Sequence, residues 1–194
     1  MLQLVLNYIA QNIYEVLGFI TSLICVYYNA RQKIVGWYWA IISGILSAKL
    51  FYDIKLFGDM YLQFFFIITA FYGIYEWKYC INDQKEYPIR KANLKIWCII
   101  VIFFVIAYPL IILLLAHQKS DLIYIDGFTS CLSVLAQILM TRKYLENWLI
   151  WIFVNILYVG LYAYKGVWLY SILYLIFIFL AYYGLQSWKK TLKK

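Results

Sequence analysis

The sequence contains little charge, little proline and almost no histidine. Charged residues make up 13% of its 194 residues, two residues are proline, and His117 is the only histidine. So small a charged fraction excludes a soluble globular domain, whose surface needs a larger share of polar residues. The chain also lacks a His-Glu-x-x-His pattern and any evident nucleophile and base within its apolar segments. We therefore predict that it is not an enzyme and binds neither a metal nor a cofactor.

The cysteines show no paired spacing. There are four of them, Cys25, Cys80, Cys98 and Cys131. Disulfide frameworks and zinc sites need regularly spaced pairs, so this spacing argues against both, and the cysteines are interpreted as small apolar packing residues.

Long hydrophobic runs take up most of the chain instead. Hydrophobic residues make up 66% of the sequence, and its mean hydropathy is +0.77. A membrane helix needs about 20 apolar residues, because each residue advances about 1.5 Å through roughly 30 Å of hydrocarbon. Continuous apolar runs favour helices over membrane strands, which alternate apolar and polar residues. The runs predict an all-α integral membrane protein with seven spans: Ile13–Ala30, Trp37–Ile54, Asp59–Lys78, Lys95–Ala116, Tyr124–Thr141, Asn147–Tyr164 and Trp168–Ser187.

The chain matches itself when it is shifted by 111 positions without a gap. A self-match of this length indicates two copies of one structural unit. The shift aligns Arg31 with Arg142, Trp37 with Trp148, Tyr72 with Tyr183, Gly73 with Gly184, Trp77 with Trp188, and Lys78 with Lys189.

The two copies predict a 3+1+3 arrangement within one membrane domain, residues 1–194. The first three-helix repeat is expected at 13–78, a linker helix at 95–116 and the second repeat at 124–188. Three spans alone would invert the second copy, so the single span between the copies restores its orientation and makes the repeats parallel. Paired repeats are typical of transporters, with the binding site between the repeats near the middle of the membrane.

Basic residues set the predicted orientation. The formal net charge is +8, and 13 of the 17 lysines and arginines fall on one predicted face of the membrane. The positive-inside rule places that face and the C-terminus in the cytoplasm, with the N-terminus outside. A basic rim beside anionic lipid explains the net charge, so the lipid bilayer is the expected partner and nucleic acid is not.

The run at 147–164 carries an aromatic ladder interrupted by one carboxamide. Spacings of three or four place its members on one helical face. They are Trp148, Trp151, Asn155, Tyr158 and Tyr162. Aromatic faces stack on a flat heterocycle, and a cationic ring adds about 0.5 to 2 kcal/mol. Asn155 lies roughly 12 Å inside the membrane, where its carboxamide offers a donor and an acceptor to a ligand amide.

Four tryptophans near the predicted cytoplasmic edge have an alternative interpretation. Trp37, Trp77, Trp148 and Trp188 fit an interfacial aromatic belt, in which the rings lie at the level of the lipid headgroups. We favour the belt for these four and the ligand for Trp151.

Three carboxamides within apolar runs have two possible partners. Gln63, Gln137 and Asn155 could each form a hydrogen bond with a neighbouring helix or with a ligand. The ligand is favoured for Asn155, whereas the alternatives stay open for the two glutamines.

Several of these residues resemble the PnuC family of bacterial vitamin transporters. The longest stretch is Ile138-Leu-Met-Thr-Arg-Lys-Tyr-Leu-Glu-Asn-Trp-Leu-Ile-Trp151, continuing to Asn155. The first half agrees through Leu62-Gln63-Phe64 and through the ending Tyr72-Gly73 to Trp77. The likeness covers nearly the whole chain. The best-known members carry nicotinamide riboside, and similar proteins are associated with thiamine or riboflavin.

The resemblance implies a fold, an assembly and a mechanism. It implies a 3+1+3 fold akin to the SWEET proteins, a homotrimer, and a location in the bacterial inner membrane. Uptake would proceed by facilitated diffusion, and a cytoplasmic kinase would trap the vitamin for NAD biosynthesis. The expected substrate-binding residues are Trp151, Asn155, Gln63, Gln137, Trp148 and Tyr158. Among them, Trp151 would stack on the pyridinium ring, Asn155 would hold the carboxamide, and the two glutamines would bind the ribose.

Two alternatives stay open. Thiamine is also flat and cationic, so the aromatic ladder fits it equally well. A non-transporting membrane scaffold is an alternative of a different class. Such a scaffold would tolerate a sealed seam between the repeats, so a polar cavity at the seam would count against it.

Overall fold

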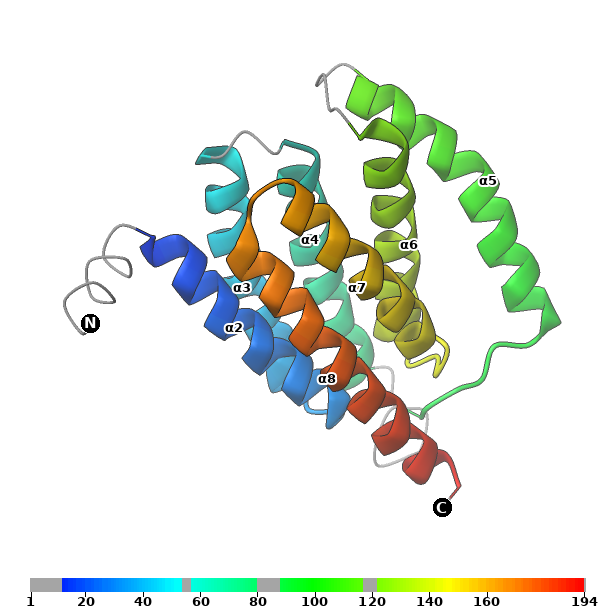
Figure 1. The fold of residues 1–194 in the computed structure, drawn as a ribbon. Helices are drawn as coiled ribbons and strands as arrows, with labels where there is room; N and C mark the ends of the chain where they lie inside the picture. Colours follow the sequence, from blue (N-terminus) through cyan, green and yellow to red (C-terminus); the bar gives the residue numbers. More distant parts are fainter. Residues whose placement is uncertain (1–11, 54–56, 80–87, 117–121, 194) are drawn as a thin grey trace.

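The chain folds into helices throughout the part described here. The computed structural model describes residues 12–53, 57–79, 88–116 and 122–193, so Cys80 and His117 lie outside it. These residues form seven α-helices and no strand, which confirms the all-α prediction (Figure 1). The helices are α2 (Ile13–Ala30), α3 (Val35–Asp53), α4 (Phe57–Tyr79), α5 (Leu94–Ala116), α6 (Ile123–Thr141), α7 (Asn147–Tyr164) and α8 (Trp168–Leu192). The predicted runs start and end within two residues of these bounds, except that α8 continues past Ser187.

Five of the helices are long and apolar enough to cross a membrane. These are α2, α5, α6, α7 and α8. Helices α3 and α4 have 19 and 23 residues, which is a sufficient length, but their apolar residues are mixed with charged residues, tyrosine and tryptophan. Their crossing of the membrane stays a prediction.

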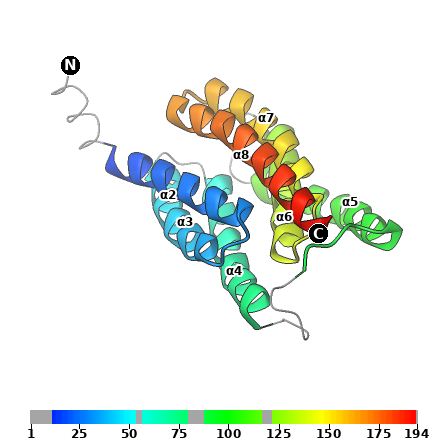
Figure 2. The same cartoon turned by 90° about the horizontal axis from the view of Figure 1, so that it is seen from below.

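The helices form two groups that pack against each other. In the first group α3 packs between α2 and α4, and in the second group α7 packs between α6 and α8. The groups meet where α2 contacts α8 and where α4 contacts α6. Helix α5 packs on α6, at the side of the second group, as both ribbon views show (Figures 1 and 2). Each contact among these six helices thus has a counterpart when α2, α3 and α4 are exchanged for α6, α7 and α8.

Residues aligned by the 111-residue shift make matching contacts. Trp37 and Trp77 meet edge to face, with ring centroids 5.2 Å apart. Trp148 and Trp188 meet in the same way at 5.4 Å. We call these four residues the tryptophan cluster. All four are buried, so the interfacial belt proposed for them is wrong: their rings fill the contact between helices and do not face lipid.

The tryptophan cluster also joins the two groups by hydrogen bonds. Trp77 Nε1 of the first group donates to the carbonyl oxygen of Thr141, at 2.9 Å, in the second group. Trp188 Nε1 of the second group donates to the carbonyl oxygen of Asn29, at 3.3 Å, in the first. These carbonyls lie in the last turns of α2 and α6, and that of Asn29 also accepts from the Gln32 N–H at 3.0 Å. The indole groups therefore connect helix ends across the seam.

An ion-pair cluster joins the groups at the opposite end of the helices. The Lys165 ammonium, just after α7, lies 2.9 Å from Asp126 Oδ1 of α6 and 3.7 Å from Asp59 Oδ2 of α4. The three side chains are only 15%, 12% and 11% exposed, respectively. One cation thus bridges carboxylates from both helix groups, in surroundings where water screens their attraction little.

Two glycines let the tryptophan cluster close, and we expect substitution of either to destabilise the fold. A Cβ at Gly73 would lie 2.5 Å from the Trp37 ring, and one at Gly184 would lie 2.6 Å from the Trp148 ring. Alanine at either position should lower the free energy of unfolding by about 1 to 3 kcal/mol, because a packed ring must move. Thermal unfolding in detergent measures this. Gly160→Ala is the matched control, since its Cβ meets no described atom within 4 Å; equal unfolding temperatures for all three variants would contradict the prediction.

Removal of the Lys165 charge should also destabilise the protein. Lys165→Met leaves two largely buried carboxylates without their shared cation, at a cost of about 3 kcal/mol. Lys49→Met is the control, because the Lys49–Asp53 pair is 48% and 42% exposed. Exposed pairs contribute at most about 1 kcal/mol. The measurement is chemical unfolding in detergent, and a loss for Lys165→Met no larger than that for Lys49→Met would count against the ion-pair cluster as a stabilising contact.

Candidate functional site

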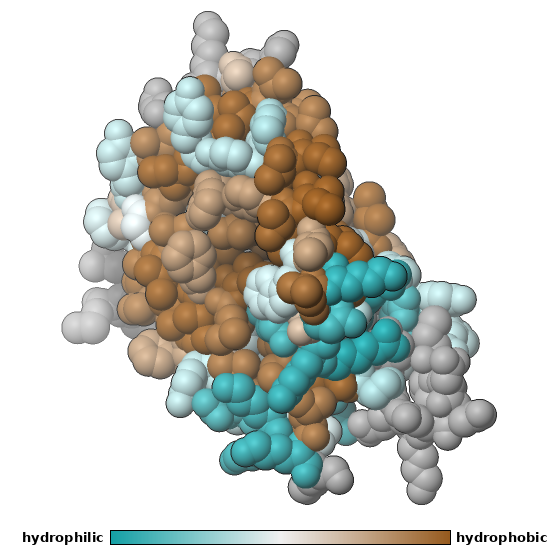
Figure 3. All heavy atoms as spheres, turned by 90° about the vertical axis from the view of Figure 1, so that its right-hand side faces the viewer, coloured by the Kyte–Doolittle hydropathy of each residue, from teal (hydrophilic) through white to brown (hydrophobic). Residues whose placement is uncertain are grey.

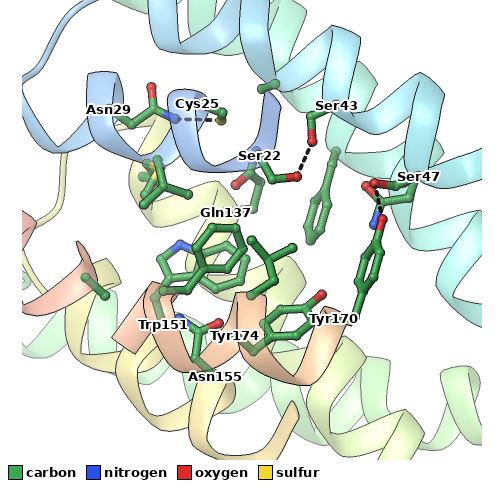
Figure 4. A pocket seen from close by; sticks show the side chains of 18 of the residues that line it. Ser22, Cys25, Asn29, Ser43, Ser47, Gln137, Trp151, Asn155, Tyr170 and Tyr174 are labelled. Carbon is green, nitrogen blue, oxygen red and sulfur yellow. Dashed lines mark hydrogen bonds between the residues drawn. The ribbon is translucent and has the colours of Figure 1, made fainter. Parts of the chain in front are cut away.

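A cavity lies between the two helix groups. Helices α2, α3 and α4 line it on one side and α6, α7 and α8 on the other, so it occupies the seam where the sequence places a binding site. Its polar lining residues are Ser22, Cys25, Asn29, Ser43, Ser47, Gln63, Gln137, Asn155, Tyr170 and Tyr174, many of them labelled in Figure 4. Its large aromatic lining residues are Phe66, Trp148, Trp151 and Phe177.

The structure brings five of the six predicted site residues together in this lining. They are Gln63 of α4, Gln137 of α6, and Trp148, Trp151 and Asn155 of α7. Residues far apart in the sequence thus share one cavity, because α4 packs against α6 and α6 against α7.

Tyr158, the sixth predicted residue, does not line the cavity. Its hydroxyl is paired with the Ser133 hydroxyl at 3.2 Å, and its ring stacks on Tyr174 with centroids 4.6 Å apart. Tyr174 stacks in turn on Tyr162 at 5.1 Å. Because Tyr174 does line the cavity, Tyr158 supports the wall from behind.

Several buried polar atoms on the lining residues are unpartnered. Asn155 is 2% exposed, yet its Oδ1 has no hydrogen-bond partner among the described residues. The same holds for Nε1 of Trp151 and of Trp148. An unpaired buried polar group costs about 1 to 3 kcal/mol. These atoms therefore keep unused hydrogen-bonding capacity, as one acceptor and two donors.

Two aromatic rings of the lining meet across the seam. Phe66 of α4 meets Trp151 of α7 at an angle of 63°, with centroids 6.1 Å apart. Figure 4 shows the Trp151 side chain on the same side of the cavity as Asn155. A carboxamide beside an indole ring suits a heterocycle that carries an amide, because stacking and hydrogen bonding act on the same ring.

The hydroxyl groups of the first helix group were not predicted from the sequence. Ser22 of α2 pairs with Ser43 of α3, Oγ to Oγ at 2.6 Å, and Ser47 of α3 pairs with the Tyr170 hydroxyl of α8 at 3.0 Å. The spacing of four between Ser43 and Ser47 places both on one helical face, and this was the available signal. It is weak, because serines in helices commonly bond the backbone of their own helix.

The lining is uncharged. None of the described residues that face the cavity is charged. Within the described ranges there is also no cluster of His, Cys, Asp and Glu that could hold a metal ion. The cavity therefore suits an uncharged ligand or a cation that aromatic faces can accommodate.

Comparison with known proteins identifies similar sequences and a similar fold. The family model described as nicotinamide mononucleotide transporter matches residues 12–190. The nicotinamide riboside transporter PnuC of Escherichia coli (strain K12) is 28% identical over 200 residues, covering 90% of this chain and 84% of that protein. The protein of the same name from Neisseria mucosa is 28% identical over 189 residues, covering 90% of this chain and 71% of that protein. A crystal structure of the vitamin B3 transporter PnuC matches with a TM-score of 0.84 at 26% identity, covering 98% of this chain and 86% of that one.

These likenesses extend over nearly the full chain. Together with the five apolar helices, they make the chain a multi-pass protein of the inner membrane. The family is one of transporters and not of enzymes. Because the family model covers residues 12–190, the chain belongs to the nicotinamide mononucleotide transporter family, the PnuC family of membrane transporters.

Proposed function

We propose that this protein takes up nicotinamide riboside by facilitated diffusion. The observation that carries the proposal is the uncharged cavity in which the Trp151 ring and the unpartnered Asn155 Oδ1 lie side by side. Nicotinamide riboside has the matching groups, namely a flat pyridinium ring with a carboxamide. The names of the similar proteins from Escherichia coli and Neisseria mucosa support the same substrate.

Different lining residues bind different parts of the substrate. Trp151 stacks on the pyridinium ring, and its indole adds a cation–π attraction of about 0.5 to 2 kcal/mol. Asn155 Oδ1 accepts a hydrogen bond from the carboxamide NH₂ group. Gln63 and Gln137 bind the ribose, and Trp148 completes the wall of the cavity.

The absence of charge in the lining favours the riboside over the mononucleotide. A phosphate group carries negative charge and needs Arg, Lys or a set of backbone N–H donors. The described lining holds no Arg and no Lys. Transfer of a phosphate into this cavity would leave it without a counter-charge, at a large desolvation cost. The riboside lacks this group.

The same lining supports transport without ion coupling. Ion-coupled carriers usually place a carboxylate beside the substrate path. Here Asp59 and Asp126 are occupied by Lys165 and lie outside the described lining. Net uptake by facilitated diffusion then requires that the riboside be removed on the cytoplasmic side. We propose that a cytoplasmic kinase phosphorylates it there, as the first step toward NAD.

The proposed architecture has two parallel three-helix repeats, 13–78 and 124–188, around the linker helix at 95–116, in one domain of SWEET-like type. The reciprocal helix contacts and the matching tryptophan pairs support it. In this arrangement α3 and α4 cross the membrane like α7 and α8, the helices with which the shift aligns them.

The proposed orientation places the C-terminus in the cytoplasm and the N-terminus outside. Figure 3 supports it, because the most strongly hydrophilic side chains gather at the lower end of that face, below an area that is mostly hydrophobic. Most basic residues fall on the side of the C-terminus. Assembly as a homotrimer follows from the family resemblance alone.

Thiamine is the second candidate, and riboflavin a more distant one. A flat cationic ring can stack on Trp151 whichever vitamin carries it. The riboside is favoured over both, because its carboxamide can form a hydrogen bond with Asn155. A non-transporting scaffold is disfavoured, because a scaffold has no need of an uncharged polar cavity at its seam.

Calorimetric titration of the purified protein should show binding of nicotinamide riboside. We expect much weaker binding of the mononucleotide, because no described cation faces the cavity to pair with its phosphate. Uptake of the riboside into proteoliposomes should be the same with and without proton or sodium gradients. Binding of thiamine alone would show that thiamine is the substrate instead. Uptake that depends on a gradient would contradict facilitated diffusion.

Substitution of the ring-binding residues should weaken riboside binding and leave the protein folded. Trp151→Ala removes the stacking surface and should lower the affinity at least about tenfold, and Asn155→Leu should abolish detectable binding. Trp97→Ala is the control, because Trp97 is exposed on α5, a helix that contributes no residue to the described lining. Calorimetry measures the affinity and thermal unfolding confirms the fold. Unchanged affinity in Asn155→Leu would remove Asn155 from the site.

A further inference from the structure

We infer that the hydroxyl pair of Ser22 and Ser43 recognises the ribose of the substrate and is a specificity determinant of the cavity. The inference rests on the proposed function and adds a second wall to the site. Figure 4 shows this pair on α2 and α3, across the cavity from Trp151 and Asn155 of α7. A ligand held by Asn155 at one end therefore meets Ser22 and Ser43 at the other.

The two walls differ because the aligned positions differ in chemistry. Where the second helix group has Trp151, the first has Ala40, and where the second has Asn155, the first has Gly44. Ser43 corresponds in turn to an apolar residue, Val154. On the α7 side the cavity thus presents Trp151 and Asn155, whereas on the α2–α3 side it presents the hydroxyls of Ser22 and Ser43. Such a site binds a molecule with two unlike halves, a flat ring and a hydroxylated group, in one orientation.

The hydroxyl pair keeps hydrogen-bonding capacity for a ligand. The two Oγ atoms lie 2.6 Å apart, so one hydroxyl donates to the other. The accepting hydroxyl retains its own O–H, and both oxygens retain lone pairs. Vicinal ribose hydroxyls can donate to one oxygen and accept from the free O–H. Ser47 is less accessible, because it is 2% exposed against 8% for Ser43, and its hydroxyl is paired with Tyr170.

The hydroxyl pair would distinguish nucleosides from other flat cations. Thiamine presents an aromatic cation to Trp151 but carries no vicinal diol, so it cannot use both serine oxygens in the same way. A site built to bind substrate hydroxyls discriminates against analogues that lack them, because its polar groups are then left without partners. The unpartnered Asn155 Oδ1 sets the position of the ring end independently.

The test is calorimetric titration of the unsubstituted protein and of Ser22→Ala, Ser43→Ala and the double variant. The ligands are nicotinamide riboside, its 2′,3′-dideoxy analogue and 1-methylnicotinamide, which carries the same cationic ring without a ribose. Each single variant should bind the riboside about three- to tenfold more weakly, the effect of one lost hydrogen bond. Affinity for 1-methylnicotinamide should not change. The dideoxy analogue should bind the unsubstituted protein and the double variant with similar affinity.

Ser133→Ala is the matched control. Ser133 is aligned with Ser22 by the 111-residue shift and is also hydrogen-bonded, but it pairs with Tyr158 and does not line the cavity. Its riboside affinity should equal that of the unsubstituted protein. Unchanged riboside affinity in the serine variants, or equal losses for riboside and 1-methylnicotinamide, would overturn the inference alone. Failure of the unsubstituted protein to bind the riboside would instead overturn the proposed function, and the inference with it.

Discussion

The reciprocal hydrogen bonds of Trp77 and Trp188 are the contact on which the rest of the structure depends. Each indole N–H donates to a carbonyl at the end of a helix in the opposite group, so each helix group completes the other. The exchange joins the last turns of α2 and α6 to the opposite helix group. It also brings α2 toward α8 and α4 toward α6, the two contacts that enclose the cavity.

The cavity lies between two sets of packed aromatic residues, one toward each end of the helices. The tryptophan cluster packs at the end of the helices near the C-terminus, where Gly73 and Gly184 let the rings approach the backbone. Tyr158, Tyr162 and Tyr174 stack toward the other end, near the ion-pair cluster. The uncharged lining between them allows a cationic nucleoside to enter and leave without a tightly held counter-ion.

Much of the fold and part of the site could be predicted from the sequence. Apolar runs located all seven helices, because the length of a membrane helix follows from the thickness of the bilayer. Buried carboxamides marked Gln63, Gln137 and Asn155, since a polar group in an apolar run is costly unless it has a use. The hydroxyls of Ser22, Ser43 and Ser47 were missed, because a serine can satisfy itself on its own helix and leaves no such mark.

The sequence by itself determined the helices, their pairing by the 111-residue shift, and which residues share a helical face. Only the tertiary structure decided what each face meets. Trp37 and its three counterparts lie in the core and not at the headgroups, and Tyr158 faces Ser133 and not the cavity, although it continues the Trp151 face. Helical periodicity shows which residues share a face of one helix. Which neighbouring helix or cavity that face contacts depends on how the helices pack together.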